Sequence, residues 1–194
     1  MRTHGAVVPM DETLWAVGRV SGFAALGLFT LTVVLGILTR SGRPLFAVPR
    51  FTVTLLHRNM SLLATAFLLL HIGTLLLDSY ARLRLADAFI PFLGAFKPFW
   101  QGLGTAAFDL VLAVVATGLL RHRIGRRTFR AVHWFSYAMW PLAMGHAIGN
   151  GTNGKDGWFL AVAAASMALV AAALLWRVSA SFLDTARARQ GILP

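Results

Sequence analysis

Four histidines lie in two apolar segments of the chain, one near each end of either segment. His57 and His71 are 14 residues apart in LLHRNMSLLATAFLLLHIG, and His133 and His146 are 13 apart in AVHWFSYAMWPLAMGHAIG. An ionisable side chain inside a membrane helix costs free energy and therefore indicates a function. Neutral imidazole is a common ligand of haem iron. Two imidazoles on one iron leave no open coordination position, which favours electron transfer over oxygen activation.

The spacing of the first pair suits two stacked macrocycles. Fourteen helical residues rise about 21 Å, and at about 100° per residue they return to within roughly 40° of the starting direction. His57 and His71 therefore share a helix face. Thirteen residues rotate by about 220°, so the second pair fits a straight helix less well. Pro141 lies between His133 and His146, and a kink there is one way to re-aim His146.

The composition indicates a membrane protein. Hydrophobic residues make up 57% of the chain and charged residues 13%, with a mean hydropathy of +0.68. Soluble domains carry roughly 25% charged residues. The absence of cysteine excludes disulfides, thiolate metal sites and thiol catalysis. The basic residues that give the net charge of +11 cluster between apolar segments. They therefore indicate membrane topology and contact with anionic groups rather than a nucleic-acid partner.

Five segments have the roughly 20 apolar residues that a membrane span needs. We expect an all-α polytopic helix bundle with about five transmembrane helices, with room for two flat macrocycles stacked between the second and fourth. Residues 14–178 form the membrane domain, residues 1–13 a short polar leader and residues 179–194 a short tail. The connector from Asp78 to Gln101 is expected to be an interfacial loop or half-helix. The five segments are Leu14–Thr39, Phe51–Leu77, Gly102–Leu120, Phe129–Gly149 and Trp158–Val178.

The distribution of arginine predicts the orientation, because short cytoplasmic loops are rich in Lys and Arg. The leader is then outside and the tail cytoplasmic, in the cell membrane. His57 and His133 lie at the cytoplasmic depth, and His71 and His146 at the outer depth. The arginines in question are Arg40, Arg43 and Arg50 in the first loop, Arg121, Arg123, Arg126, Arg127 and Arg130 in the third, and Arg177, Arg187 and Arg189 at the C-terminal end.

Several other side chains are candidate haem contacts. Haem propionates need cations, and Arg58, Arg130 and Arg50 lie where inner propionates would require them. Arg19, a charge inside the first apolar segment, is the outer candidate. Positive-inside topology or snorkelling explains these arginines equally well. Trp140, midway between the ligands of its segment, either lies between the haems or is an ordinary core aromatic.

Glycines in the apolar segments are a further signal of a cofactor. Glycine lets a flat ring or a neighbouring helix approach the backbone, and ordinary helix packing is the alternative for any one of them. The glycines are Gly22, Gly27 and Gly36 in the first segment, with Gly73, Gly118 and Gly145 elsewhere.

These residues resemble the ferric reductase-like transmembrane domain, the family shared by ferric reductases and NADPH oxidases. The resemblance rests on histidine pairs spaced 14 and 13 apart in alternate, co-directional helices, with a basic residue beside the first ligand. LHRNMSLLATAFLLLHIGT is similar to bacterial stand-alone members, and the resemblance covers residues 14–178. It implies two bis-histidine b haems, with His57 and His133 on the inner iron and His71 and His146 on the outer. Electrons would pass from the cytoplasmic side to the outer face.

The chain departs from the family pattern in two ways. Five helices are visible where the oxidases have six, and no flavin or nicotinamide domain or Gly-rich dinucleotide fingerprint is present. We therefore expect a membrane haem subunit of an oxidoreductase. Its donor is a separate flavoprotein or a membrane quinol. Its acceptor is external, such as ferric iron, oxygen or an extracytoplasmic flavoprotein.

Three other functions remain open at this point. One is a quinol-linked cytochrome b that acts at its own surface. Another is a small haem-free transporter that uses the histidines as proton relays, which calls for intramembrane carboxylates. Asp109 is the only clear carboxylate in the apolar segments. A purely structural membrane subunit is the third.

Overall fold

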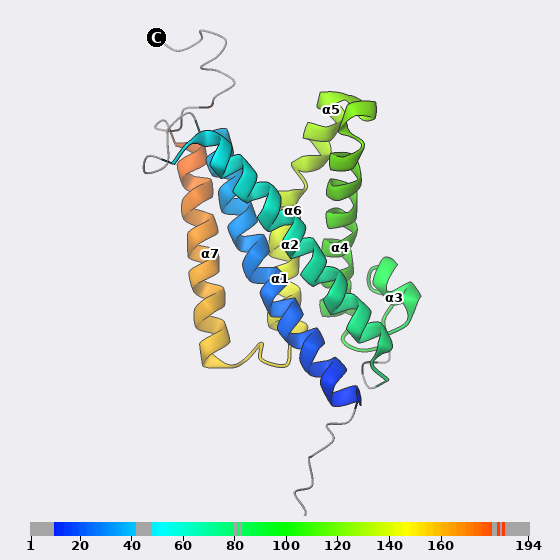
Figure 1. Cartoon of the computed structure of the whole chain (residues 1–194). Helices are drawn as coiled ribbons and strands as arrows, with labels where there is room; N and C mark the ends of the chain where they lie inside the picture. Colours follow the sequence, from blue (N-terminus) through cyan, green and yellow to red (C-terminus); the bar gives the residue numbers. More distant parts are fainter. Residues whose placement is uncertain are drawn as a thin grey trace, which may run out of the picture.

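The computed structural model describes residues 10–41, 48–79, 81, 83–179, 182 and 184. Most of the predicted leader and tail, with Arg43, Arg187 and Arg189, lies outside these residues. The described part of the chain forms seven helices and no strand (Figure 1). They are α1 (Met10–Arg40), α2 (Arg50–Leu77), α3 (Leu85–Phe89), α4 (Pro98–Leu119), α5 (Arg121–His133), α6 (Ser136–Asn150) and α7 (Gly157–Val178).

Four of these helices are long and apolar enough to cross a membrane, which confirms a multi-pass membrane protein. They correspond to four of the five predicted segments, with bounds that differ by a few residues at each end. Leucines on their outer faces stay exposed, as lipid-facing side chains do, Leu62 and Leu69 of α2 among them. The four spans are Glu12–Arg40, Arg50–Leu77, Pro98–Leu119 and Gly157–Val178.

The fifth predicted segment, 129–149, is not one continuous helix. α5 ends at His133 and α6 begins at Ser136. Three backbone bonds of the i→i−3 type close the junction: Phe135 to Val132 at 3.0 Å, Tyr137 to Trp134 at 3.1 Å and Ala138 to Phe135 at 3.0 Å. The five arginines of α5 make it too polar for lipid, and it lies at the end of the bundle, where Gly125 (φ 79°) divides it into two helical pieces and the second leads into α6. α6 has 15 residues, a length of about 22 Å.

Four helices pack as two antiparallel hairpins, α1 with α2 and α4 with α6. α7 lies against α1, and α1 also contacts α6, which joins the hairpins. α1 contributes a buried stripe at every fourth position, Ala25, Phe29, Val33 and Ile37. This spacing keeps one helix face toward the core. The indole Nε1–H of Trp140 in α6 donates to the Thr30 hydroxyl of α1 at 3.0 Å.

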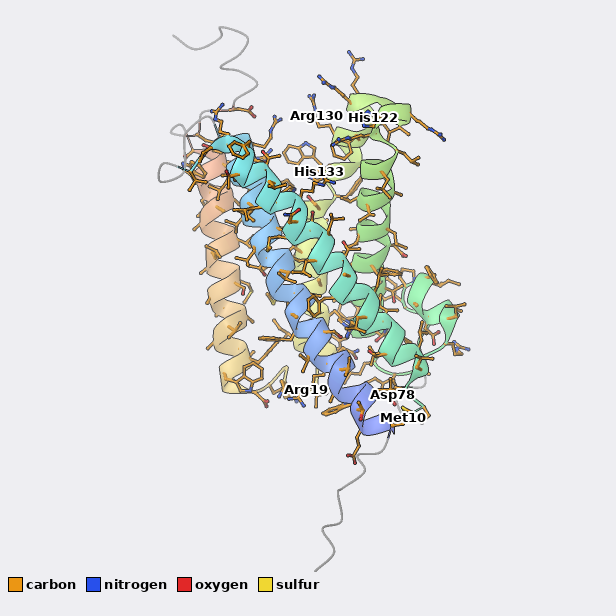
Figure 2. All side chains as sticks on the ribbon, in the orientation of Figure 1. Met10, Arg19, Asp78, His122, Arg130 and His133 are labelled. Carbon is orange, nitrogen blue, oxygen red and sulfur yellow. The ribbon has the colours of Figure 1, made fainter. Side chains whose placement is uncertain are left out.

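The two ends of the bundle differ in charge. One end, called the Arg-rich end below, holds Arg40, Arg50, α5 and Arg177; the opposite end holds Met10, Arg19, α3 and the 151–156 loop (Figures 1 and 2). The predicted clustering of the loop arginines is thus a spatial feature of the fold. Which end faces the cytoplasm stays a prediction.

The connector between α2 and α4 contains a short helix, α3, as the predicted half-helix requires. Arg84 and Asp87 form an ion pair at 2.8 Å, and the Arg84 backbone N–H donates to the same carboxylate at 3.0 Å. The Thr105 hydroxyl of α4 donates to the Asp87 carbonyl at 2.8 Å. Hydrogen bonds from Arg84 lower the pKa of Asp87. These contacts fix α3 to the start of α4.

Candidate functional site

The fold brings the four histidines together as two pairs, each between α2 and the α5–α6 segment. The ring centroids of His57 and His133 are 6.2 Å apart at an interplanar angle of 78°. Those of His71 and His146 are 6.5 Å apart at 77°. The first pair lies toward the Arg-rich end, where Figure 2 labels His133, and the second toward the opposite end. The two pairs thus repeat one geometry at two depths.

The junction between α5 and α6 explains how a 13-residue spacing matches a 14-residue one. A 3₁₀ turn rises about 2.0 Å and rotates about 120° per residue, against 1.5 Å and 100° in an α-helix. Three i→i−3 bonds therefore add roughly 1.5 Å and 60°, so 13 residues span about 21 Å, as 14 do, and their rotation increases from about 220° to about 280°, against about 320° for 14 regular residues. The irregularity lies at Trp134–Phe135, whereas Pro141 is inside α6.

Three of the four imidazoles form a hydrogen bond to a backbone carbonyl through Nδ1. The contacts are His57 to Thr32 at 3.0 Å, His71 to Gly18 at 2.6 Å and His146 to Trp100 at 2.9 Å. A carbonyl oxygen can only accept, so each Nδ1 carries the proton and donates. The lone pair is then on Nε2, which is the tautomer that binds a metal through Nε2.

A glycine makes each of these three contacts possible. The acceptor carbonyl is always four residues before a glycine: Thr32 before Gly36, Gly18 before Gly22, and Trp100 before Gly104. A helical side chain leans toward the N-terminus and covers the preceding turn, so a Cβ at the glycine would cover that carbonyl. An ideal Cβ would lie 2.7 Å from His71 Nδ1 at Gly22, 2.5 Å from His146 Nδ1 at Gly104, and 3.2 Å from His57 Cε1 at Gly36.

His133 is the exception. Its Nδ1 is buried and has no hydrogen-bond partner among the described residues. The Phe129 ring lies beside it, with centroids 5.2 Å apart. Buried polar atoms are nearly always paired in native proteins, so this nitrogen marks an incomplete site.

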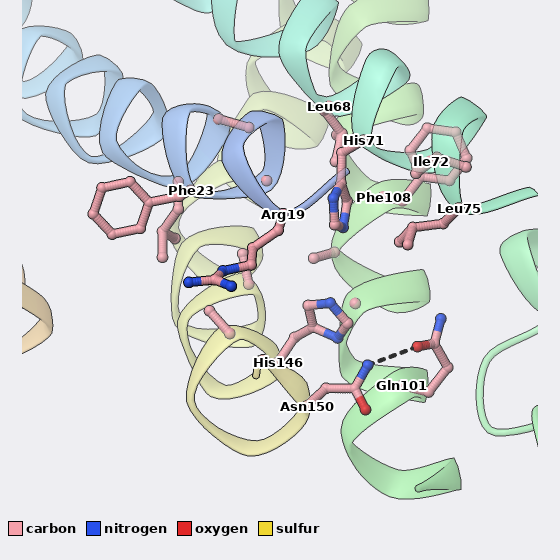
Figure 3. Close-up of a pocket in the computed structure, with 18 of the residues that line it drawn as sticks. Arg19, Phe23, Leu68, His71, Ile72, Leu75, Gln101, Phe108, His146 and Asn150 are labelled. Carbon is pink, nitrogen blue, oxygen red and sulfur yellow. Dashed lines mark hydrogen bonds between the residues drawn. The ribbon is translucent and has the colours of Figure 1, made fainter. Parts of the chain in front are cut away.

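The His71–His146 pair opens into a cavity of about 380 Å³. Figure 3 shows His71 and His146 projecting into it from α2 and α6, with Arg19 of α1 at its edge. At the end of the cavity, the Asn150 amide donates to the Gln101 side-chain oxygen at 2.9 Å. Apolar residues form much of the remaining wall, among them Phe29 of α1, Leu68 of α2 and Phe108 of α4. An apolar cavity with a few polar groups at one end suits a flat, amphipathic ligand.

The candidate cations are placed at both ends. Arg19 is exposed, lines the cavity beside His71 and His146, and lies 5.0 Å from the Trp15 ring centre. Arg58 and Arg130 are exposed, and Arg50 opens α2 at the Arg-rich end. Arg19, Arg58 and Arg130 form no ion pair with any described residue. They are thus able to bind an anionic ligand.

Trp140 and Asp109, which the sequence singled out, differ in their contacts. Trp140 is 6% exposed and belongs to the α1–α6 core, so packing alone accounts for its burial. Asp109, which one reading of the sequence pairs with Lys97, has no hydrogen-bond or ion-pair partner among the described residues. Lys97 donates to the Gly149 carbonyl at 3.0 Å.

The residues present fit haem better than a bare metal ion. Within the described residues, His, Asp and Glu form no group of three or more that could hold a metal ion. Haem iron takes four ligands from its own ring and needs only two from the protein. Two imidazole nitrogens on opposite sides of one metal, each at the roughly 2.0–2.1 Å usual for histidine, place their ring centroids roughly 6 Å apart. Both observed separations match that value.

The model of the family described as "Ferric reductase like transmembrane component" matches residues 21–144. The chain belongs to this family. The match runs from Ser21 in α1 to Met144 in α6, so it includes His57, His71 and His133 and ends two residues before His146. Comparisons with curated proteins and with solved structures gave no match.

Membership of the ferric reductase-like family supports a membrane electron-transfer role, and such domains generally bind haem. The sequence analysis missed Gly104 and the three acceptor carbonyls. A signal was present: Gly22 and Gly36 are 14 residues apart, and so are Gly104 and Gly118. This is the same interval as between His57 and His71.

Proposed function

We propose that the chain is the di-haem membrane subunit of an oxidoreductase and carries electrons across the cell membrane. The observation that supports this most is the repeated geometry of the two histidine pairs, with three Nδ1 atoms bound to backbone carbonyls. In the ferric reductase-like family, that geometry corresponds to bis-histidine b haem sites. The inner iron takes His57 and His133, and the outer iron takes His71 and His146.

The hydrogen bonds of the histidines prepare their rings to bind iron. Each Nδ1–H donation fixes the ring orientation, increases the basicity of Nε2 and directs its lone pair toward the partner ring. Bound haem supplies a one-electron iron couple. Two histidine ligands exclude substrate from each iron, so the acceptor receives electrons at the protein surface rather than on the metal.

Charged and aromatic side chains complete the proposed sites. Arg58, Arg130 and Arg50 bind the inner propionates and Arg19 the outer ones, because a guanidinium donates to both oxygens of a carboxylate. Trp140 lies between the two pairs along α6 and separates the sites.

The direction of transfer follows from the arginine distribution. We assign the Arg-rich end to the cytoplasm and the opposite end to the outside, with the N-terminus outside. The donor is a separate flavoprotein or a membrane quinol at the cytoplasmic side. The acceptor is ferric iron, oxygen or an extracytoplasmic flavoprotein at the outer face.

Oxidised and dithionite-reduced visible spectra, with the haem-to-protein ratio of the detergent-purified chain, test the proposal. Two low-spin b haems per chain are expected. One haem per chain would reject one histidine pair. Protein made with haem supplied, yet purified without any, would refute the proposal and leave the proton-relay and structural alternatives.

A further inference from the structure

The Nδ1 atom of His133 has no hydrogen-bond partner among the described residues, and α4 has a glycine and a backbone carbonyl at the corresponding position. The other three histidines each lie against a glycine and bind the carbonyl four residues before it. On α1 the two such glycines, Gly22 and Gly36, are 14 residues apart. On α4, Gly104 serves His146, and 14 residues further along is Gly118.

The helix register places Gly118 at the depth of His133. α4 and α6 are antiparallel, so moving 14 residues up α4 from Gly104 corresponds to moving back along α6 and α5 from His146. The tightened junction makes the 13 residues between His146 and His133 as long as 14 regular ones. The carbonyl four residues before Gly118 is that of Val114.

The Val114 carbonyl resembles an acceptor that is already in use. It accepts the Thr117 hydroxyl at 3.1 Å, just as the Gly18 carbonyl accepts the Ser21 hydroxyl at 3.0 Å. The Gly18 carbonyl nonetheless binds His71 at 2.6 Å. A serine or threonine three residues further on therefore does not prevent an imidazole from binding.

Gly118 differs from the other three glycines in what lies above it. An ideal Cβ there would meet only the Phe129 ring, at 3.9 Å, an ordinary van der Waals distance. Phe129, which also contacts His133, occupies the space that an imidazole fills at Gly22, Gly36 and Gly104.

We propose that Gly118 and the Val114 carbonyl position His133: when the inner haem is bound, the His133 ring lies over Gly118 and donates from Nδ1 to Val114, and Phe129 moves aside. This inference rests on the proposed function. It makes Gly118 a positioning residue for a ligand on another helix.

Replacement of Gly118 by alanine distinguishes the proposal from the contacts now present. With only Phe129 nearby, Gly118→Ala is harmless. If His133 lies over Gly118, the methyl group displaces the ring, and inner-haem affinity falls about ten- to hundredfold, the usual effect of losing a partner of a metal-binding histidine. Haem titration and the midpoint potential of each haem measure this. Gly104→Ala should weaken the outer haem alone, and Gly27→Ala, with no atom within 4 Å, should change neither.

The outcomes separate cleanly. Selective loss of the inner haem from Gly118→Ala, with the outer haem retained as proof of folding, supports the inference. Wild-type haem content and potentials in that variant overturn it. Phe129→Ala gives a second test that does not depend on Gly118: the inner haem should stay bound, and its loss would show that Phe129 holds His133 instead. A wild-type chain without haem would refute the proposed function itself.

Discussion

Replacing Gly22 with alanine is expected to weaken the outer haem while leaving the fold nearly as stable as before. The new Cβ would lie 2.7 Å from His71 Nδ1 and 2.8 Å from its Cε1, whereas non-bonded atoms settle at roughly 3.5–4.0 Å. The ring must therefore retreat by about 1 Å, which takes the 2.6 Å bond to the Gly18 carbonyl beyond hydrogen-bonding range. Loss of such a partner lowers metal affinity about ten- to hundredfold, or about 1.4–2.8 kcal/mol.

The effect of Gly22→Ala on the stability of the haem-free protein is smaller, because two free-energy contributions oppose each other. Alanine is favoured over glycine in a helix by about 1 kcal/mol, which roughly cancels the loss of the hydrogen bond, also worth about 1 kcal/mol. Gly27→Ala on the same helix is the matched control, since it gains the helix preference without meeting any atom within 4 Å. Haem titration and thermal unfolding of both variants are the assays. If Gly22→Ala and Gly27→Ala bind the outer haem equally well, the glycine does not position His71.

Three further predictions concern the ligand pairing, the core and the connector. His71→Ala should leave about one haem per chain, with the inner one retained, and full haem content in the purified variant would contradict the pairing. Trp140→Phe removes the donor to Thr30 and should cost about 1 kcal/mol in thermal unfolding, with haem content unchanged; a haem loss would instead implicate Trp140 in the site. Arg84 lowers the pKa of Asp87, so this carboxylate stabilises the connector above the ordinary carboxyl pKa of 3.8, and that stabilisation is lost as the pH falls through the lower folded value. Pepsin should therefore cleave the wild-type chain near α3 faster as the pH falls. After normalisation for pepsin activity, the rate at which pepsin cleaves the Asp87→Asn variant should be the same at each pH.

Much of the fold follows from the sequence, because a membrane span is a property of one continuous apolar segment. α1, α2, α4 and α7 lie within a few residues of their predicted bounds. The division of 129–149 could not be foreseen, because Trp134 and Phe135 are not helix breakers and the only proline, Pro141, lies inside α6. Trp134 and Phe135 keep right-handed helical dihedral angles, so the division is a local tightening of the helix that no single residue type announces.

The candidate site could likewise be predicted only in part from the sequence. The histidines stand out because an imidazole in lipid is unusual on its own. Gly104 does not, because its role depends on α6 packing beside α4, and only then does His146 meet its surface. The 14-residue glycine interval was readable in the sequence, but it becomes informative only when the two helices that carry it are paired with the histidine helices.

The two hairpins also have a consequence for how the protein is made. Within each hairpin, one helix supplies the carbonyls and the other the histidines: α1 serves α2, and α4 serves α6. Each proposed haem, by contrast, takes one histidine from each hairpin. The hairpins can therefore enter the membrane in succession with His57, His71 and His146 already oriented, and the cofactor then adds a late link to the α1–α6 contacts that join the hairpins. In cells starved of haem the hairpins should be joined by protein contacts such as those of α1 with α6, and a protease should reach the connector between α2 and α4 first.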